Sequence, residues 1–174
     1  MSAAVDRELP LEFQDLLKEA QAATTSGWRQ IGCPNGVAIF VKRDPVTGGN
    51  MVKGRAVVAV SPAELACCIN LQDRYQWDEL YLKGHDIEHV ENSNAHTISY
   101  LAYRSPIKFV NGRDFVLRVA RHELDDGTLL IKSQSVDRPA VPPQEGLVRA
   151  VIHRAGFVIQ PHGAGKSAGT LCCG

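Results

Sequence analysis

Apolar residues recur at helical spacing near the start of the chain and predict a first, amphipathic helix over about residues 9–23. The positions that would share its inner face are Leu9, Phe13, Leu16, Leu17 and Ala20. After Gly27 the period changes, because apolar and polar residues begin to alternate. The remainder of the chain is therefore predicted to be mainly β-structure.

Period-two alternation predicts about seven strands. They lie at about 37–42, 56–60, 83–91, 96–104, 113–124, 128–137 and 147–160. The turn signals between them are Gly48-Gly49-Asn50, Asn92-Ser93-Asn94, Asn111-Gly112, Asp125-Asp126-Gly127 and the segment 139–146. Connections of hairpin length favour one curved antiparallel sheet. Such a sheet, with apolar residues on its inner face, tends to enclose a cavity.

A second helix is predicted to interrupt the strands. Ser61 can cap it, Pro62 suits the first helical position, and Glu64 can complete a capping box. A short helical turn is predicted within 72–82, around Trp77. The fold class is therefore α+β.

Charge and composition exclude several kinds of partner. The 174 residues contain 19 Lys+Arg and 19 Asp+Glu, so there is no electrostatic reason to expect nucleic acid. No apolar run reaches the roughly 18 residues that a membrane span needs, and the N-terminus does not resemble a signal peptide. The five cysteines suit neither a disulfide framework nor CxxC metal ligation. We therefore expect a cytoplasmic protein without a metal or cofactor.

Five short strings together resemble the START domains, the lipid-transfer domains related to the steroidogenic acute regulatory protein. The strings are Gly27-Trp28, Gln76-Trp77-Asp78-Glu79, Gly112-Arg113-Asp114-Phe115-Val116, Ser135-Val136-Asp137 ahead of Pro142-Pro143, and Leu147-Val148-Arg149-Ala150. They occur in the family's order across residues 27–163. The resemblance implies a helix-grip fold, in which a curved antiparallel sheet surrounds an apolar tunnel that holds one lipid.

The resemblance also implies a function without catalysis: a monomer would take a phospholipid, ceramide or sterol from one membrane during a transient contact and release it at another. In the family, a further strand and a long C-terminal lid helix follow the position of residues 165–167. Here the chain stops at Gly174, so residues 1–174 are expected to form one START-like domain without that strand and helix. A lipid-sensing regulatory module, or a truncated isoform without transfer activity, is the alternative.

Two residues of the predicted helical turn match polar contacts of the family. Arg74 stands where phosphatidylcholine and ceramide carriers place an arginine facing the lipid head, and its planar fork could hold a phosphate. Asp78 matches an acidic residue that contacts head groups in the same carriers. The alternatives are an exposed helix arginine and a surface or ion-paired carboxylate.

Three further residues are expected to be structural. Trp77 is expected in the core, with its N–H bonded to an acceptor. Arg113 and Asp114 are adjacent on a strand and so point to opposite faces, where each would be anchored to another element.

The residues at positions that match the head-group contacts of known carriers limit which lipid head the chain is expected to bind. Alignment of the motifs places the aromatic cage of phosphatidylcholine carriers on Leu101, Phe115 and His153. One clear aromatic does not make a cation–π box for choline. The acid and arginine of cholesterol carriers fall on Ser99 and Val119, so that charged pair is missing. Tyr100 completes the predicted lipid contacts.

Competing catalytic chemistry has weaker support. His85-Asp86-Ile87-Glu88-His89 fits the H-x-x-E-H pattern of zinc metalloproteases, but turn signals bracket it and favour a strand. An enzyme on a related helix-grip scaffold would have only His153 and Asp78 as candidate groups. We therefore predict no catalytic residues and no metal site.

Overall fold

The computed structural model describes residues 9–22, 26–90, 96–163 and 165–173. In these ranges one sheet contains ten strands. The strands are β1 (Arg29–Gly32), β2 (Ala38–Arg43), β3 (Asn50–Val58), β4 (Tyr81–Val90), β5 (His96–Tyr103), β6 (Gly112–Glu123), β7 (Leu129–Ser135), β8 (Leu147–Arg149), β9 (Ala155–Pro161) and β10 (Ser167–Cys173). Two α-helices accompany this sheet in the described ranges, α1 (Leu11–Gln21) and α2 (Pro62–Cys68). The α+β class is confirmed.

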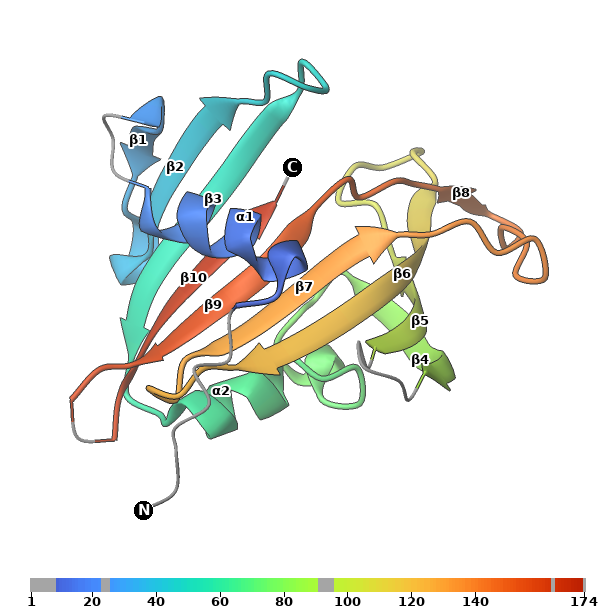
Figure 1. Ribbon diagram of the computed structural model, residues 1–174. Helices are drawn as coiled ribbons and strands as arrows, with labels where there is room; N and C mark the ends of the chain where they lie inside the picture. Colours follow the sequence, from blue (N-terminus) through green and yellow to red (C-terminus); the bar gives the residue numbers. More distant parts are fainter. Residues whose placement is uncertain (1–8, 23–25, 91–95, 164, 174) are drawn as a thin grey trace.

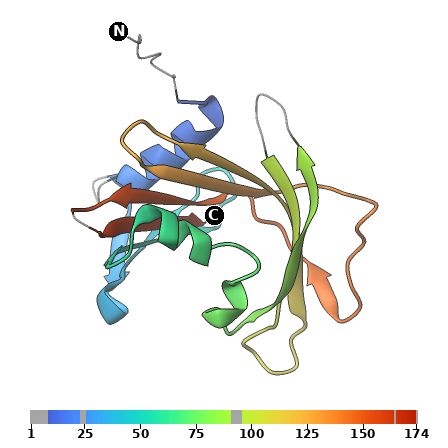
Figure 2. The same cartoon turned by 90° about the horizontal axis from the view of Figure 1, so that it is seen from below.

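The sheet is antiparallel along its main path, which runs β1-β2-β3-β10-β9-β7-β6-β5-β4, while β8 pairs in parallel with β6. It bends so strongly that β4 and β5 stand at a steep angle to β9 and β10 (Figure 2). Helix α2 and the 3-10 turn η3 (Arg74–Gln76) lie inside the bend, and α1 lies on the outer side (Figures 1 and 2). No helix in the described ranges is both long and apolar enough to cross a bilayer.

Alternation along the central strands supplies the two faces of the core. Leu130 and Val158 face outward and pack with Phe13 and Leu16 of α1. Their sequence neighbours Ile131 and Ile159 face inward and pack with Ala66 and Ile69 at α2. Because successive side chains of a strand point to opposite faces, one run of apolar residues serves both layers.

The start of α2 follows the sequence signal. Ser61 Oγ accepts from the backbone N–H of Glu64, and the Glu64 carboxylate accepts from the backbone N–H of Ser61. The predicted capping box is therefore confirmed, with Pro62 at the first helical position.

A buried lysine anchors the end of α1, and no sequence signal indicated it. Lys53 on β3 is 1% exposed, and its Nζ donates to the carbonyls of Glu19 and Ala22 at 2.9 Å each. The ammonium also lies 4.3 Å from the centroid of the Trp28 ring. Burial lowers the pKa of Lys53. A cation at a helix C-terminus is favourable because unpaired carbonyls point there.

Asp114 ties β6 to the segment that carries β8. It is completely buried, and its carboxylate accepts from Arg149 at 2.9 and 3.2 Å. Tyr100 Oη donates to it at 3.3 Å and the backbone N–H of Gln144 at 3.2 Å. Burial by itself would raise the pKa of Asp114, but these donors lower it. Burial and the neighbouring carboxylate raise the pKa of Tyr100 to about 12.

Two expectations about the strands need correction. A C-terminal strand was expected to be missing, but β10 occupies Ser167–Cys173 and pairs with both β3 and β9. The predicted strand 147–160 is two strands, β8 and β9, because the chain leaves the sheet between residues 150 and 154. The predicted turn at residues 92–94 lies outside the described residues.

Candidate functional site

The inner face of the bent sheet contains a hollow with a volume of about 600 Å³. We call this cavity the hollow. Its apolar wall comes from β5, β6, β9, β10 and the segment before β9. The principal apolar side chains are Leu101, Phe115, Leu117, Ile152, Phe157 and Leu171. Ligand sites are typically concave and mostly apolar with a few polar groups, and the hollow fits that description.

The strand register explains why these side chains converge. Leu101 pairs with Phe115 across β5 and β6, and Phe157 pairs with Leu171 across β9 and β10. Residues opposite each other in neighbouring strands point to the same face. Leu101 is 4% exposed, so this wall is already desolvated at its deepest point.

Arg74 stands at the polar end of the hollow. Its Nη1 donates to Tyr103 Oη at 2.5 Å and its Nη2 donates to the Ile69 carbonyl at 3.1 Å. Its buried Nε has no partner among the described residues. The guanidinium also lies 5.6 Å from the Trp77 ring. A buried N–H without a partner is costly, so Nε is a donor whose hydrogen bond is still to be made.

A smaller cavity of about 110 Å³ adjoins the hollow beneath the segment that joins α2 to η3. We call this cavity the polar lobe. The hollow and the polar lobe share Arg74, Leu101, Leu117, Ser133 and Phe157. The polar lobe is also lined by Asp86, Thr97, Ser99 and Arg121.

Asp86 is the site residue that sequence reasoning missed. It pairs with Ser99 across β4 and β5, and Ser99 Oγ donates to Asp86 Oδ1 at 2.7 Å. Ser99 itself is 3% exposed. The only sequence signal was the alternation of β4, which could not fix the register against β5. Positions 99 and 119, which match the acid and the arginine of cholesterol carriers, hold Ser99 and Val119. The polar lobe nevertheless contains a carboxylate, which comes from Asp86 on the neighbouring strand.

An apolar side cavity of about 460 Å³ opens next to the hollow and shares Trp77, Phe157 and Leu171 with it. Trp77 is 52% exposed, so the expectation that it belongs to the core is wrong. Its indole N–H donates to the Cys68 carbonyl at 2.7 Å, which holds the ring beside both cavities. Trp77 directly follows the short turn η3, and its ring lines these two cavities instead of packing in the sheet core.

Asp78, Arg113, Phe115 and Leu101 all line the hollow. Asp78 Oδ1 accepts from the backbone N–H of Leu80 at 3.2 Å. Arg113 donates to the carbonyls of Asn111 and Gly112 in its own segment, at 2.6 and 3.2 Å, and does not show the expected anchor to another element.

Two predicted lipid contacts lie elsewhere. Tyr100 is completely buried on the outer face, where it packs with Ile98 and Val116, because its neighbour Leu101 takes the inner face. His153 is exposed in the irregular segment before β9, where its neighbour Ile152 lines the hollow. The alignment of motifs that named His153 did not account for the irregular segment between β8 and β9.

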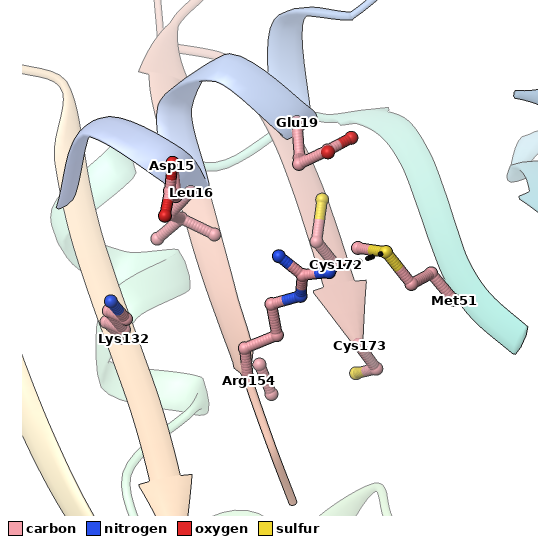
Figure 3. A pocket seen from close by; sticks show the side chains of 9 residues that line it. Asp15, Leu16, Glu19, Met51, Lys132, Arg154, Cys172 and Cys173 are labelled. Carbon is pink, nitrogen blue, oxygen red and sulfur yellow. Dashed lines mark hydrogen bonds between the residues drawn. The ribbon is translucent and has the colours of Figure 1, made fainter. Parts of the chain in front are cut away.

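A second small cavity, of about 50 Å³, lies between α1 and the outer face of the sheet (Figure 3). Arg154 lies there with its guanidinium toward Met51, and it also donates to Asp44 at 2.9 Å. Lys132 donates to the Glu12 carbonyl at 2.5 Å. Because Arg154 and Lys132 are bonded to the protein and this cavity is much smaller than the hollow, the hollow is the candidate ligand site.

The histidines of the H-x-x-E-H string lie on β4, as predicted. His85 lies against Tyr100 with ring centroids 5.4 Å apart, and His89 Nδ1 lies 3.3 Å from Thr97 Oγ1. Across the described ranges, no three His, Cys, Asp or Glu side chains gather where they could hold a metal ion.

The loop between β5 and β6 forms part of the rim of the hollow and carries exposed apolar side chains. Ile107 is 64% exposed and Phe109 is fully exposed. Phe109 has φ 64°, a conformation that is uncommon outside glycine. Basic residues Arg104 and Lys108 belong to the same loop.

Comparison with known proteins places this architecture among characterised folds. The family model described as START domain matches residues 11–173. Human StAR-related lipid transfer protein 6 is 26% identical over 138 residues, which is 79% of this chain and 62% of that protein. StAR-related lipid transfer protein 5 of Bos taurus is 28% identical over 142 residues, 78% of this chain and 65% of that protein. The chain thus spans less than two thirds of the length of these relatives.

A solved structure shows the same fold. Human StAR-related lipid transfer protein 5 superposes with a TM-score of 0.82 at 25% identity, over 91% of this chain and 76% of that one. The curved, open antiparallel sheet with its two helices matches the helix-grip arrangement of that structure.

Proposed function

Because the chain belongs to the START domain family, we propose that it binds a single lipid in the hollow and transfers it between membranes. The observation that carries the proposal is the hollow itself, whose apolar wall ends at Arg74, where a buried N–H has no partner among the described residues. The ligand is a phospholipid, a ceramide or a sterol. These lipids share a large apolar body and one polar end.

The wall and the polar end meet separate physical needs of such a ligand. Each CH2 group removed from water contributes about 0.8 kcal/mol, so an apolar wall suffices for the lipid body. The polar head must exchange its water for other hydrogen-bond partners. Arg74 and Asp78 supply a donor and an acceptor at the hollow, and these are the head-group contacts that we propose.

Membrane contact is proposed to occur through the loop between β5 and β6. Ile107 and Phe109 are exposed there, at the rim of the hollow. Exposed apolar side chains flanked by Lys108 and Arg104 suit the boundary between acyl chains and anionic head groups. A lipid would then pass between the bilayer and the hollow over a short path.

We further propose that the chain acts as one domain and a monomer in the cytoplasm, and that it performs no catalysis. Its exposed cysteines Cys33, Cys67 and Cys68 are free thiols, which a reducing compartment favours. Binding and release of an unchanged lipid require no cofactor.

The test is transfer of a fluorescent lipid between donor and acceptor vesicles, with binding measured separately. Ile152→Asp places a charge in the hollow, and its neighbour Val151, which is 64% exposed, provides the matched control Val151→Asp. We expect Ile152→Asp to weaken binding and slow transfer by about tenfold or more, which corresponds to about 1.4 kcal/mol. Val151→Asp should behave as the wild type.

Each outcome separates the candidate functions. A wild-type chain that binds lipid and does not accelerate transfer would support a lipid-sensing module or a transfer-inactive isoform instead. A folded wild-type chain that binds none of the three lipid classes would refute the proposal. Thermal melting of both variants checks that the Ile152→Asp effect does not come from unfolding.

A further inference from the structure

The loop between β5 and β6 contains a serine–proline pair, Ser105-Pro106, with Lys108 three residues after the serine. Serine followed directly by proline, and then by a basic residue at this distance, is the pattern that proline-directed protein kinases modify. Kinases use such charge patterns to discriminate among substrates. The loop that is proposed to contact the membrane therefore contains a candidate phosphorylation site.

The structure leaves the Ser105 hydroxyl accessible. Ser105 is half-buried at the rim of the hollow, and residues 106–111 after it are exposed and lie outside helices and strands. Its Oγ accepts from the backbone N–H of Ile107 at 3.1 Å, a bond that uses a lone pair and not the hydroxyl proton. A phosphate oxygen on Ser105 can accept from the same N–H, so the modified loop keeps an acceptor there.

The chain contains one other serine–proline pair, Ser61-Pro62, which lacks both of these properties. Ser61 Oγ accepts from the backbone N–H of Glu64 at 3.3 Å and donates to the Glu64 carboxylate at 2.7 Å, so its hydroxyl is held in the capping box of α2. Glu64 is also the residue three positions after this serine, where Lys108 stands relative to Ser105. Ser61 is therefore an internal comparison with the same dipeptide, an occupied hydroxyl and the opposite charge.

A phosphate on Ser105 would remove the positive charge of this loop. Residues 104–111 contain two basic residues, Arg104 and Lys108, and no acidic residue, so their net charge is +2. Phosphoserine adds about −1.5 to −2 at pH 7, which brings the net charge close to zero. Each basic residue near an anionic membrane strengthens attachment by about fivefold. The charge would also stand between the exposed side chains of Ile107 and the rim, where it opposes insertion into an apolar interface.

Taking the proposed membrane contact through this loop as given, we propose that Ser105 is phosphorylated by a proline-directed kinase and that the phosphate releases the chain from anionic membranes. Ser105 Oγ attacks the γ-phosphorus of Mg-bound ATP, and the new O–P bond forms as the bond from that phosphorus to the β,γ-bridging oxygen breaks. ADP leaves, and the hydroxyl proton passes to the catalytic carboxylate of the kinase. The unmodified chain attaches to the membrane and the phosphorylated chain detaches.

The first experiment identifies the modified serine. The purified chain is incubated with Mg-bound ATP and a proline-directed kinase that prefers a basic residue three positions after the serine, and its phosphopeptides are quantified by mass spectrometry. We expect phosphate on Ser105 to exceed that on Ser61 by tenfold or more. Ser105→Ala should remove the signal and Ser61→Ala should keep it. Modification mainly at Ser61, or none at Ser105 while a standard Ser-Pro substrate in the same reaction is modified, would overturn the site.

The second experiment measures the effect of the phosphate and does not depend on the choice of kinase. Phosphoserine is incorporated at position 105 during translation, and the chain is sedimented with phosphatidylcholine vesicles that either contain or lack phosphatidylserine. We expect binding to the anionic vesicles to fall by tenfold or more, and binding to the neutral vesicles to change by less than threefold. Phosphoserine at position 26 is the charge-matched control, because Ser26 is exposed just before β1, which lies far from the loop between β5 and β6 (Figures 1 and 2). It should sediment as the unmodified chain does.

The outcomes distinguish this inference from the proposed function. Equal sedimentation with and without phosphate on Ser105, an equal loss with phosphoserine at position 26, or an equal loss on neutral vesicles would overturn the electrostatic release while the membrane contact stands. Failure of the unmodified chain to sediment with anionic vesicles would refute the membrane contact and, with it, the release. Lipid binding in the hollow is measured separately and is decided by neither result.

Discussion

Replacement of Asp114 by alanine is expected to destabilise the fold strongly without touching the hollow. The carboxylate is completely buried and accepts from the Arg149 side chain, Tyr100 Oη and the backbone N–H of Gln144. Alanine would leave all three donors without this acceptor. Arg149 would keep its bond to the Val141 carbonyl, at 3.0 Å, and would lose the charge that balances it.

The size of the effect follows from the ion pair. Removing one partner of a buried pair costs about 3–5 kcal/mol, because it leaves the other charge uncompensated. The remaining side chain of Arg149 is 24% exposed, so partial access to water places the expected loss toward the lower end of that range. For a chain of this length each kcal/mol corresponds to about 2–4 °C in Tm, so a loss of about 3 kcal/mol gives a decrease of about 6–12 °C.

Differential scanning calorimetry on wild type and variant measures this decrease. Glu88→Ala is the control, because it breaks the exposed pair between Glu88 and Arg138 and should cost less than about 1 kcal/mol. A Tm for Asp114→Ala within 2 °C of the wild type, or equal to that of Glu88→Ala, would refute the reasoning that Asp114 organises a buried network. That threshold equals the smallest shift expected for a loss of one kcal/mol.

Three further outcomes are expected. Gly84→Ala should cost about 1–3 kcal/mol in urea unfolding, because the added Cβ overlaps Tyr81 Oη and lies 3.0 Å from the Tyr100 carbonyl; an unchanged midpoint would contradict this. The lowered pKa of Asp114 stabilises the fold above the unfolded pKa of about 3.9 and ceases to do so as pH falls through the folded value. The difference in unfolding free energy between wild type and Asp114→Asn should therefore shrink from pH 6 to pH 3, and a constant difference would argue against it. Phe109→Asp, which tolerates φ 64°, should weaken sedimentation with anionic vesicles and leave lipid binding intact, whereas equal sedimentation would exclude this loop as the membrane contact.

The periodicity of the sequence was sufficient for most of the elements, and the alignment of motifs named Leu101 and Phe115 of the wall of the hollow. Leu101 and Phe115 reach the inner face because alternation in a strand is a local property of the chain. Tyr100, predicted beside Leu101 as a lipid contact, lies on the opposite face, because successive residues of a strand point to opposite faces. His153 was placed by alignment of motifs, and the irregular segment before β9 leaves it exposed while its neighbour Ile152 lines the hollow.

Other features depend on contacts that sequence spacing does not encode. Asp86 enters the polar lobe because β4 pairs with β5 in a register with irregularities between Tyr81 and Lys83 and between Asp86 and Glu88. A register with such shifts cannot be counted from the sequence. A lysine is expected at the surface, yet Lys53 is buried, because carbonyls at the end of α1 accept hydrogen bonds from its ammonium group. Trp77 shows the reverse: its large ring was expected to be buried, and it is exposed.

Native mass spectrometry of the purified chain after exposure to mixed vesicles tests the central claim most directly. The account predicts one lipid per chain, and loss of that complex in Ile152→Asp but not in Val151→Asp. A folded wild-type chain that carries no lipid after this exposure would contradict the claim that the hollow is a lipid site.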